Sequence, residues 1–310
     1  MRKSSDKVVV TGGAGFIGSH LVDALFQLDE AEIVVIDNLH RGRLANLSGH
    51  LTDPRIRIVN GDVRDYATVA DAMRGASLVY HLAAESTVMG AARDIDYTFT
   101  TNVAGTFNVL KAAAEARVAR LVFSSSREVY GEPVCVPVDE THPLMSINSY
   151  GASKVAGEAL CRAFTRERGI ATSILRLANV FGPRDFGRVI PHWIELASTG
   201  QDLVVYGGNQ IIDFIWVADV VAALLKAGAA DGALPPMNVA SGTGTKILDL
   251  ARRVTLIAGG SSKVTVMPRR SIEVTRFIGD PARLTQLLGL APPPDPLANL
   301  TALVRPLAVA

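Results

Sequence analysis

Two residues four positions apart, Tyr150 and Lys154, have the types and spacing needed for acid/base chemistry in this 310-residue chain. Positions i and i+4 share a helix face, so the two side chains are expected one above the other. A free tyrosine has a pKa of about 10, and bringing it near 7 takes about three units, or roughly 4 kcal/mol. One cation about 4 Å away supplies roughly that at an effective dielectric constant near 20. Tyr150 is therefore predicted to remove a proton from an alcohol whose oxygen Ser126 holds; a chance pairing on a helix is the alternative.

Oxidising an alcohol also requires a hydride acceptor, and the N-terminal stretch indicates one. The apolar run 8–11 is typical of a buried parallel strand, and Gly12, Gly15 and Gly18 follow at three-residue spacing. In such a turn the glycines permit a tight bend, a close approach of a pyrophosphate and helix-to-strand packing. A second apolar run ends in Asp37, nineteen residues beyond Gly18, where a carboxylate holds the adenosine ribose of a dinucleotide.

The predicted cofactor is NAD, because the charge of Asp37 repels the 2′-phosphate of NADP. Arg41 and Arg43 leave NADP open as an alternative. Further cofactor contacts are predicted in the glycine turn and near the carboxyl ends of the next strands, at Phe16, Ile17, Asn38, Asp62, Val63, Leu82, Ala83, Ala84, Asn102 and Ser124, with Tyr150 and Lys154 beside them. Asp62 is either an acceptor for the adenine amine or a helix N-cap, and Asn102 is either near the cofactor or an ordinary surface residue.

The elements that position these residues alternate between strand and helix. Strands are predicted at 32–36, 56–59, 77–81, 121–126 and 174–177, and helices at about 16–28, 66–74, 97–116 and 150–168. This rhythm predicts an α/β fold with a doubly wound parallel sheet, a Rossmann domain, followed by a smaller C-terminal substrate-binding lobe. The predicted division is 1–178 for the dinucleotide-binding domain and 179–310 mainly for the lobe, with 214–241 returning to the first domain.

Composition narrows the class of protein. The chain is 48% hydrophobic with a formal net charge of +1, which predicts a globular protein without the long-range field needed to bind nucleic acid. We expect no membrane association, because no apolar run is long enough to span a bilayer and no signal peptide is evident. Cys135 and Cys161 are the two cysteines, which argues against a disulfide framework or structural zinc and favours the cytoplasm.

Taken together, these motifs resemble the extended short-chain dehydrogenase/reductases, in particular the NAD-dependent nucleotide-sugar epimerases and dehydratases. The resemblance covers nearly the whole chain and is carried by Gly12-x-x-Gly15-x-x-Gly18, Asp37, Asp62, Ser124-Ser-Ser126, Val129-Tyr-Gly131, Tyr150-x-x-x-Lys154 and Asp213-Phe-Ile-Trp-Val-Ala-Asp219. It implies NAD as cofactor, a UDP-sugar as substrate, and catalysis by Ser126, Tyr150 and Lys154. As in relatives, the helices at about 97–116 and 150–168 are expected to pair with their copies in a homodimer.

The same resemblance implies a set of substrate contacts. Asn179 and Arg270 would contact the nucleotide diphosphate, Val189 and Ile190 the uracil, and Glu273 the uridine ribose. One departure concerns Ile212, which stands where many members place a phosphate-binding arginine. Either Arg270 suffices, or another cation such as Arg188 takes its place.

The reaction type depends on the segment Ser126-Arg-Glu-Val-Tyr-Gly131. In the family, 4-epimerases carry Ser-x-x-Val-Tyr-Gly, 4,6-dehydratases Thr-Asp-Glu-Val-Tyr-Gly and glucuronate decarboxylases Thr-Ser-Glu-Val-Tyr-Gly. Arg127 replaces the acid of dehydratases by a cation, which argues against dehydration and favours a substrate carboxylate at C6, paired in bidentate geometry. Glu128 is either a retained acid/base, a partner of Arg127 or of a backbone donor, or part of a pair turned away from the substrate.

The preferred reading is an NAD-dependent UDP-sugar 4-epimerase that interconverts gluco and galacto configurations through a 4-keto intermediate. UDP-glucuronate is the favoured substrate, with UDP-glucose as another. The alternatives are a UDP-glucuronate decarboxylase, in which the same intermediate loses its carboxylate, and a non-catalytic dinucleotide-sensing protein.

Overall fold

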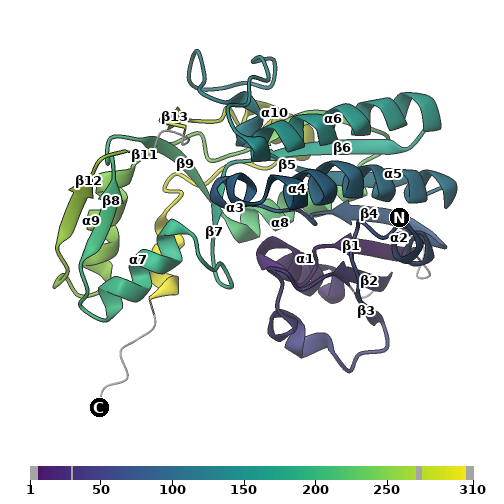
Figure 1. The fold of residues 1–310 in the computed structure, drawn as a ribbon, viewed down its shortest axis with the longest axis horizontal. Coiled ribbons are helices and arrows are strands. Elements are labelled where there is room, and N and C mark those ends of the chain that lie inside the picture. Colours follow the sequence, from purple (N-terminus) through teal and green to yellow (C-terminus); the bar gives the residue numbers. More distant parts are fainter. Residues whose placement is uncertain (1–5, 29–30, 270–273, 305–310) are drawn as a thin grey trace.

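Seven parallel strands form the larger sheet in a computed structural model that describes residues 6–28, 31–269 and 274–304 (Figure 1). Their order is β10-β6-β5-β4-β1-β2-β3, so the direction of winding reverses between β1 and β4, as in a doubly wound sheet. This confirms the predicted α/β fold class. The strands are β1 (Asp6–Thr11), β2 (Ala31–Asp37), β3 (Ile56–Asn60), β4 (Ala76–His81), β5 (Arg120–Ser126), β6 (Ala171–Leu177) and β10 (Leu234–Val239).

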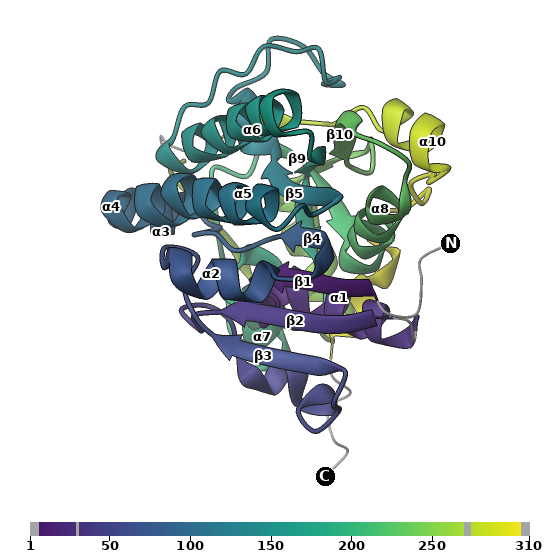
Figure 2. The same ribbon diagram turned by 90° about the vertical axis from the view of Figure 1, so that its right-hand side faces the viewer.

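Helices cover both faces of this sheet (Figure 2). Successive side chains of a strand point to opposite faces, and in β1 the side chains of Val8 and Val10 pack into one core while Val9 packs into the other. A strand buried on both sides needs no polar alternation, which is why β1 reads as a continuous apolar run. One layer contains α1 (Phe16–Gln27), α8 (Val217–Ala229) and α10 (Ala282–Leu288), and the other contains α2 (Tyr66–Met73), α5 (Gly105–Glu115) and α6 (Ser149–Arg168).

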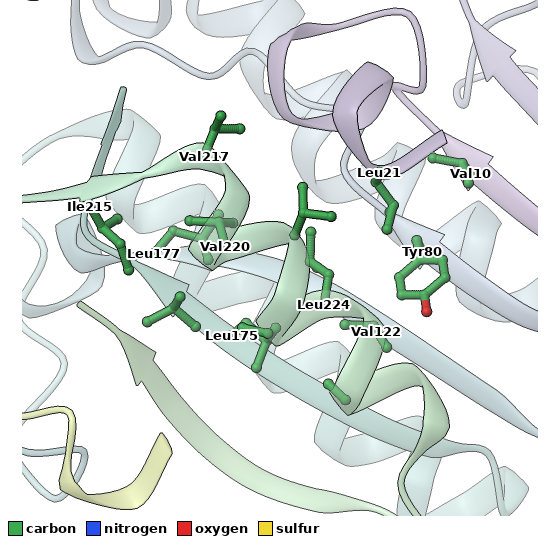
Figure 3. Close-up of a cluster of buried hydrophobic side chains, with 14 of the residues drawn as sticks. Val10, Leu21, Tyr80, Val122, Leu175, Leu177, Ile215, Val217, Val220 and Leu224 are labelled. Carbon is green, nitrogen blue, oxygen red and sulfur yellow. The ribbon is translucent and has the colours of Figure 1, made fainter. Parts of the chain in front are cut away.

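The core between α8 and the sheet joins distant parts of the sequence. Figure 3 shows Val220 and Leu224 of α8 beside Leu175 of β6 and Val122 of β5. Ile215, in the strand before α8, contributes to the same cluster. Residues of the C-terminal half therefore hold the sheet that carries the predicted dinucleotide site.

The helix predicted at 97–116 is interrupted. The structure has α3 (Val88–Arg93) and α4 (Ile95–Phe99), then a π-helical turn η2 (Thr100–Ala104) that leads into α5. Asn102 lies in this turn, and its side chain exchanges two hydrogen bonds with the backbone of Glu85. The local widening of the helix therefore coincides with a side chain that ties it to the segment after β4.

The smaller lobe is built on β9, which pairs with β7, β11 and β13, and on a separate β8–β12 pair. The sequence pattern predicts short strands near 203–206 and 211–215, which correspond to β8 and β9, whereas β7, β11, β12 and β13 were not predicted. The elements are β7 (Asn179–Phe181), β8 (Leu203–Tyr206), β9 (Ile211–Trp216), β11 (Gly244–Lys246), β12 (Val264–Met267), β13 (Arg276–Phe277), α7 (Val189–Ser198) and α9 (Ile247–Ile257). The described residues also form 3-10 helices at η1 (Leu44–His50), η3 (Arg127–Tyr130) and η4 (Ala298–Leu303).

The chain returns to the main sheet after β9. Strand β10 pairs with β6 at the edge of that sheet, and α8 packs against it. Residues 214–216 belong to β9 and pair with β7, so the return begins later than the predicted residue 214.

Candidate active site

A cleft of about 620 Å³ lies at the carboxyl ends of the main strands and extends against the smaller lobe. This is the edge at which doubly wound sheets bind ligands. Most of the predicted site residues line it: Gly12, Gly15, Phe16, Ile17, Gly18, Asp37, Asn38, Val63, Leu82, Ala83, Ala84, Ser124, Ser126, Arg127, Glu128, Tyr150, Lys154, Asn179, Arg188, Val189 and Ile190. Asp62 and Asn102 are not among the residues that line it, and Arg270 and Glu273 lie outside the described residues.

The glycine turn has the close backbone approach that a dinucleotide requires. Gly12 has φ +72°, and a Cβ there would lie 2.7 Å from the backbone nitrogen of Ala83. A Cβ at Gly18 would clash with the carbonyl oxygen of Gly12. Only glycine therefore fits at these two positions, which leaves the first turn of α1 open to a pyrophosphate.

Asp37 lies at the end of β2, where the ribose of the dinucleotide is expected. Its side chain accepts hydrogen bonds from the backbone nitrogens of Ala14 at 2.9 Å and Leu39 at 2.8 Å. Burial raises the pKa of Asp37, and these two hydrogen bonds oppose the rise. The carboxylate is thus fixed against the glycine turn while it faces the cleft, so these residues fit a dinucleotide.

Asp62 is turned toward its own strand end. Its carboxylate accepts from the guanidinium of Arg64 at 2.8 and 2.9 Å and from the amide of Asn38 at 2.8 Å. Burial would raise the pKa of Asp62, but the bonds from Arg64 and Asn38 outweigh it and lower the pKa to about 2. Asp62 is not a helix N-cap either, since Asp65 caps α2. In this structure its side chain positions Asn38 rather than facing the cleft.

Asn102 has a similar indirect place. It is buried, and besides its bonds to Glu85 its amide donates to the hydroxyl of Ser153 at 2.9 Å. Ser153 stands between Tyr150 and Lys154 on α6. Asn102 is therefore a positioning residue for the catalytic helix, and the predicted direct contact with the cofactor is not part of this geometry.

Tyr150, Ser126 and Lys154 converge in the cleft. Tyr150 shares a side-chain hydrogen bond with Ser126. The ammonium of Lys154 lies 5.9 Å from the centroid of the Tyr150 ring and donates to the carbonyl oxygen of Ser124 at 2.8 Å. The helix face and the end of β5 thus bring together the three groups predicted to handle the substrate hydroxyl.

The electrostatics differ from the prediction in one respect. Burial raises the pKa of Tyr150, and the main opposing effects come from Ser126 and Arg188, not from Lys154. Burial also lowers the pKa of Lys154 to about 8, so its charge is still present at pH 7. The chain's own groups therefore do not make Tyr150 acidic by themselves, and the positive nicotinamide ring of a bound NAD would add a charge that lowers its pKa.

Arg127 and Glu128 form a buried pair at the edge of the cleft. Nη2 of Arg127 lies 2.8 Å from Oε1 of Glu128, and its Nε donates to Asn179. The amide of Asn148, the N-cap of α6, donates to Oε2 of Glu128 at 2.7 Å. Nη1 of Arg127 is buried without a hydrogen-bond partner in the described part of the chain. Both N–H donors of Nη1 thus remain unpaired within the described residues, and the bidentate pair with a substrate carboxylate stays a prediction.

The smaller lobe contributes its side of the cleft through the start of α7. Val189 and Ile190 form its first turn, and the guanidinium of Arg188 lies 5.5 Å from the centroid of the Phe16 ring. Ile212 is buried in the core of the smaller lobe. Among the described residues of this lobe, Arg184 and Arg188 are the cations that line the cleft.

Among the cleft-lining residues that were not predicted are Asp185 and Phe186. The buried carboxylate of Asp185 accepts from Arg188 at 3.0 Å, and the ring of Phe186 lies 3.8 Å beneath the guanidinium of Arg43. Nothing in the local sequence distinguishes them from an ordinary loop. Asp185 is buried, whereas the Phe186 side chain is exposed and contacts Arg43 from the other lobe.

Within residues 6–28, 31–269 and 274–304 there is no cluster of histidine, cysteine and carboxylate side chains suited to a metal ion. Over the same residues, every helix is too short or too polar to cross a bilayer.

Known proteins with similar sequence and structure agree with this geometry. The profile of the NAD-dependent epimerase/dehydratase family matches residues 8–240. A provisionally named UDP-glucose 4-epimerase of Methanocaldococcus jannaschii is 37% identical over 227 residues, which cover 71% of this chain and 72% of that protein. UDP-glucuronic acid decarboxylase 1 of Xenopus tropicalis is 30% identical over 302 residues, 94% of this chain and 69% of that protein. The crystal structure of a UDP-glucose 4-epimerase from Thermotoga maritima with UDP-glucose superposes with a TM-score of 0.90 at 31% identity, covering 96% and 97% of the two chains.

Proposed function

The chain belongs to the NAD-dependent epimerase/dehydratase family of the extended short-chain dehydrogenase/reductases, and from this premise we propose that it is a UDP-sugar 4-epimerase. NAD is the cofactor, as the family and the glycine turn agree. The favoured substrate is UDP-glucuronate, with UDP-glucose as the neutral alternative. The observation that carries the choice of reaction is the Arg127–Glu128 pair beside Ser126.

The proton chemistry follows from three side chains. Ser126 holds the oxygen at C4 of the sugar, and Tyr150 takes the hydroxyl proton. Lys154 keeps a positive charge beside Tyr150 at neutral pH. NAD bound against the glycine turn and Asp37 would supply the reversible hydride acceptor for C4. Tyr150 gives its proton back to the oxygen at C4 after the 4-keto sugar has turned its other face, so there is no net redox change.

Arg127 supports epimerisation over decarboxylation. Its free Nη1 can donate to a carboxylate at C6, and such a charge-assisted contact stabilises the charged ground state that decarboxylation must lose. Both oxygens of Glu128 are already engaged, Oε1 in an ion pair with Arg127 and Oε2 as an acceptor from the amide of Asn148, so this carboxylate is held in place. The decarboxylase remains the second candidate because relatives with that name match 94% of the chain.

We further propose that the protein is a homodimer. Ile95, Phe99 and Phe107 are exposed on α4 and α5, and the Phe107 ring meets that of Phe164 from α6 at 5.9 Å between centroids. An exposed apolar face of this kind on neighbouring helices is typical of an interface.

A product assay tests the reaction. The NAD-loaded protein is incubated separately with UDP-glucose and UDP-glucuronate, and the nucleotide sugars are separated. A galacto product without release of carbon dioxide supports the 4-epimerase, and its absence with both substrates would contradict it. Release of carbon dioxide from UDP-glucuronate would instead identify the decarboxylase.

A further inference from the structure

The segment from Gly182 to Arg188, between β7 and α7, is held on two sides of the cleft. Arg184 pairs with Asp23 of α1 at 2.7 Å, and Phe186 packs under Arg43 from the loop after β2. This segment therefore spans from the smaller lobe to the dinucleotide half of the cleft. Its side chains that face the cleft are held in place by these two contacts.

Among the side chains of this segment that line the cleft is the carboxylate of Asp185. The side chain of Asp185 is 1% exposed, and one of its oxygens accepts from Arg188 at 3.0 Å. The other oxygen, Oδ2, is buried and has no hydrogen-bond partner among the residues that the structure describes. Burial raises the pKa of Asp185 to about 6, although Arg188 and Arg41 both act to lower it. A hydrogen bond from the backbone of Phe186 also acts to lower it. A buried carboxylate with one oxygen left unpaired is costly, so the fold retains a group that is poised to change its partner or its charge.

The surroundings of this pair favour an anion. Arg188 lies over Phe16 at the first turn of α1, and it also immediately precedes the first turn of α7. Neither helix has an acidic residue in its first turn, and no side chain of the described residues caps either one. The first residues of both helices and Arg188 thus line the same cleft, and Asp185 is the negative group that is now paired with the guanidinium.

We propose that Asp185 and Arg188 form an exchangeable pair at a diphosphate site: when a diphosphate diester binds, Arg188 transfers from Asp185 to a phosphate oxygen, and Asp185 takes up one proton from solvent. The protonated carboxyl then donates a hydrogen bond to the ligand, while no bond of the diphosphate is made or broken. That the ligand is a nucleotide sugar rests on the proposed function. NAD carries the same diphosphate chemistry and is therefore tested in parallel.

A pH dependence of binding follows. In the ligand-free protein Asp185 loses its proton near pH 6, whereas two phosphate charges beside it would hold the proton to higher pH. Binding therefore takes up a proton above pH 6 and weakens as the pH rises, whereas below pH 6 Asp185 already carries the proton. The other charged group that acts on Asp185 is Arg41, which pairs with Glu85, as does His40. Arg43 and Arg184 contact the same segment through Phe186 and Asp23. His40 is the control because its imidazole pairs with Glu85 and not with Asp185.

The experiment is calorimetric titration of the protein with UDP-glucose in the presence of saturating NAD, at pH 6 and pH 8, each in two buffers of different ionisation enthalpy. A diester is used because its phosphates do not titrate in this range. We expect wild-type affinity to fall about fivefold or more between the two pH values, with proton uptake on binding. Asp185→Asn should bind with a pH dependence below about twofold and more tightly than wild type at pH 8. His40→Gln should retain the wild-type dependence.

A second titration uses NAD without nucleotide sugar. If NAD alone binds with proton uptake, and this uptake is lost in Asp185→Asn, the exchangeable pair is supported and its ligand is the diphosphate of NAD. Wild-type binding that is flat with pH for both ligands, or an unchanged slope in Asp185→Asn, would overturn the proposal. These outcomes are independent of the product assay. If the protein binds UDP-glucose with proton uptake but forms no galacto product, the proposed 4-epimerase function is contradicted and the exchangeable pair is not.

Discussion

The ammonium of Lys154 lies 5.9 Å from the ring centroid of Tyr150, on the same face of α6 and at the end of β5. Its hydrogen bond to the carbonyl oxygen of Ser124 fixes it there, so the charge is held near the phenol rather than bonded to it. The two residues can therefore be separated by mutation, one for its proton and one for its charge.

Replacing Tyr150 by Phe removes the proton acceptor and leaves the ring. We expect turnover to fall by about 10²- to 10⁴-fold, the range for loss of a positioned acid/base group. The affinity for NAD should change little, because the glycine turn and Asp37 are untouched. Steady-state kinetics with the preferred UDP-sugar, beside a titration with NAD, checks both statements. Turnover at the wild-type rate in this variant would exclude Tyr150 as the base.

Replacing Lys154 by Met removes the charge. Lys154 is not among the main groups that lower the pKa of the Tyr150 phenol, so its loss should raise that pKa only slightly, and the pH at which the rate reaches half its maximum should move upward by less than about one unit. A pH–rate profile from pH 6 to 10 measures the shift. An unchanged profile with a lower rate at every pH would show that Lys154 acts only through the geometry of its contact with Ser124.

Arg127→Met tests the substrate carboxylate. Because a hydrogen bond to a charged group contributes about 1.5–3 kcal/mol, kcat/KM for UDP-glucuronate should fall by about 10- to 100-fold more than kcat/KM for UDP-glucose. The ratio of the two values is the measurement, since general damage to the site affects both substrates alike. An equal loss on both would leave Arg127 with a structural role through Glu128 and Asn179.

Gly18→Ala tests the turn. The added methyl group would clash with the carbonyl oxygen of Gly12, so we expect a lower melting temperature and weaker binding of NAD. Gly49→Ala is the matched control because no atom lies within 4 Å of the new Cβ there. Similar behaviour of the two variants would show that the turn can relax.

Phe107→Glu tests the apolar face of α4 and α5. A charge there should convert a dimer into a monomer in sedimentation experiments. Leu256→Glu on α9, where the native side chain is 76% exposed, should leave the assembly unchanged. A monomeric wild-type protein would contradict the dimer directly.

The main sheet could be predicted because its strands are buried on both faces. Runs such as 8–10 and 121–123 are continuous and apolar. Each is followed by a residue with a hydroxyl group, Thr11 or Ser124, near the edge of the sheet where ligands bind. The short strands of the smaller lobe give no such signal. Asn179–Phe181 becomes a strand only by pairing with Phe214–Trp216, more than thirty residues away.

The same limit applies to the site. Residue type and spacing place Tyr150, Lys154 and the glycines, because one helix or one turn sets their geometry. Asp62 and Asn102 are residue types that could contact a cofactor. In the structure Asp62 is instead hydrogen-bonded to Arg64 and Asn102 to the backbone of Glu85, which sequence spacing does not reveal. Asp185 is inconspicuous in the sequence, and its unusual environment arises only where the two lobes meet.

The repeated passage of the chain between the lobes has a consequence for unfolding. The backbone leaves the main sheet after β6, returns for α8 and β10, leaves again for β11 to β13, and comes back in α10 before η4 packs on the smaller lobe. Neither lobe is a contiguous stretch of sequence, so neither can be excised as an autonomous fragment. Heat or denaturant should melt both in one cooperative transition, and a single nick in either should loosen the other.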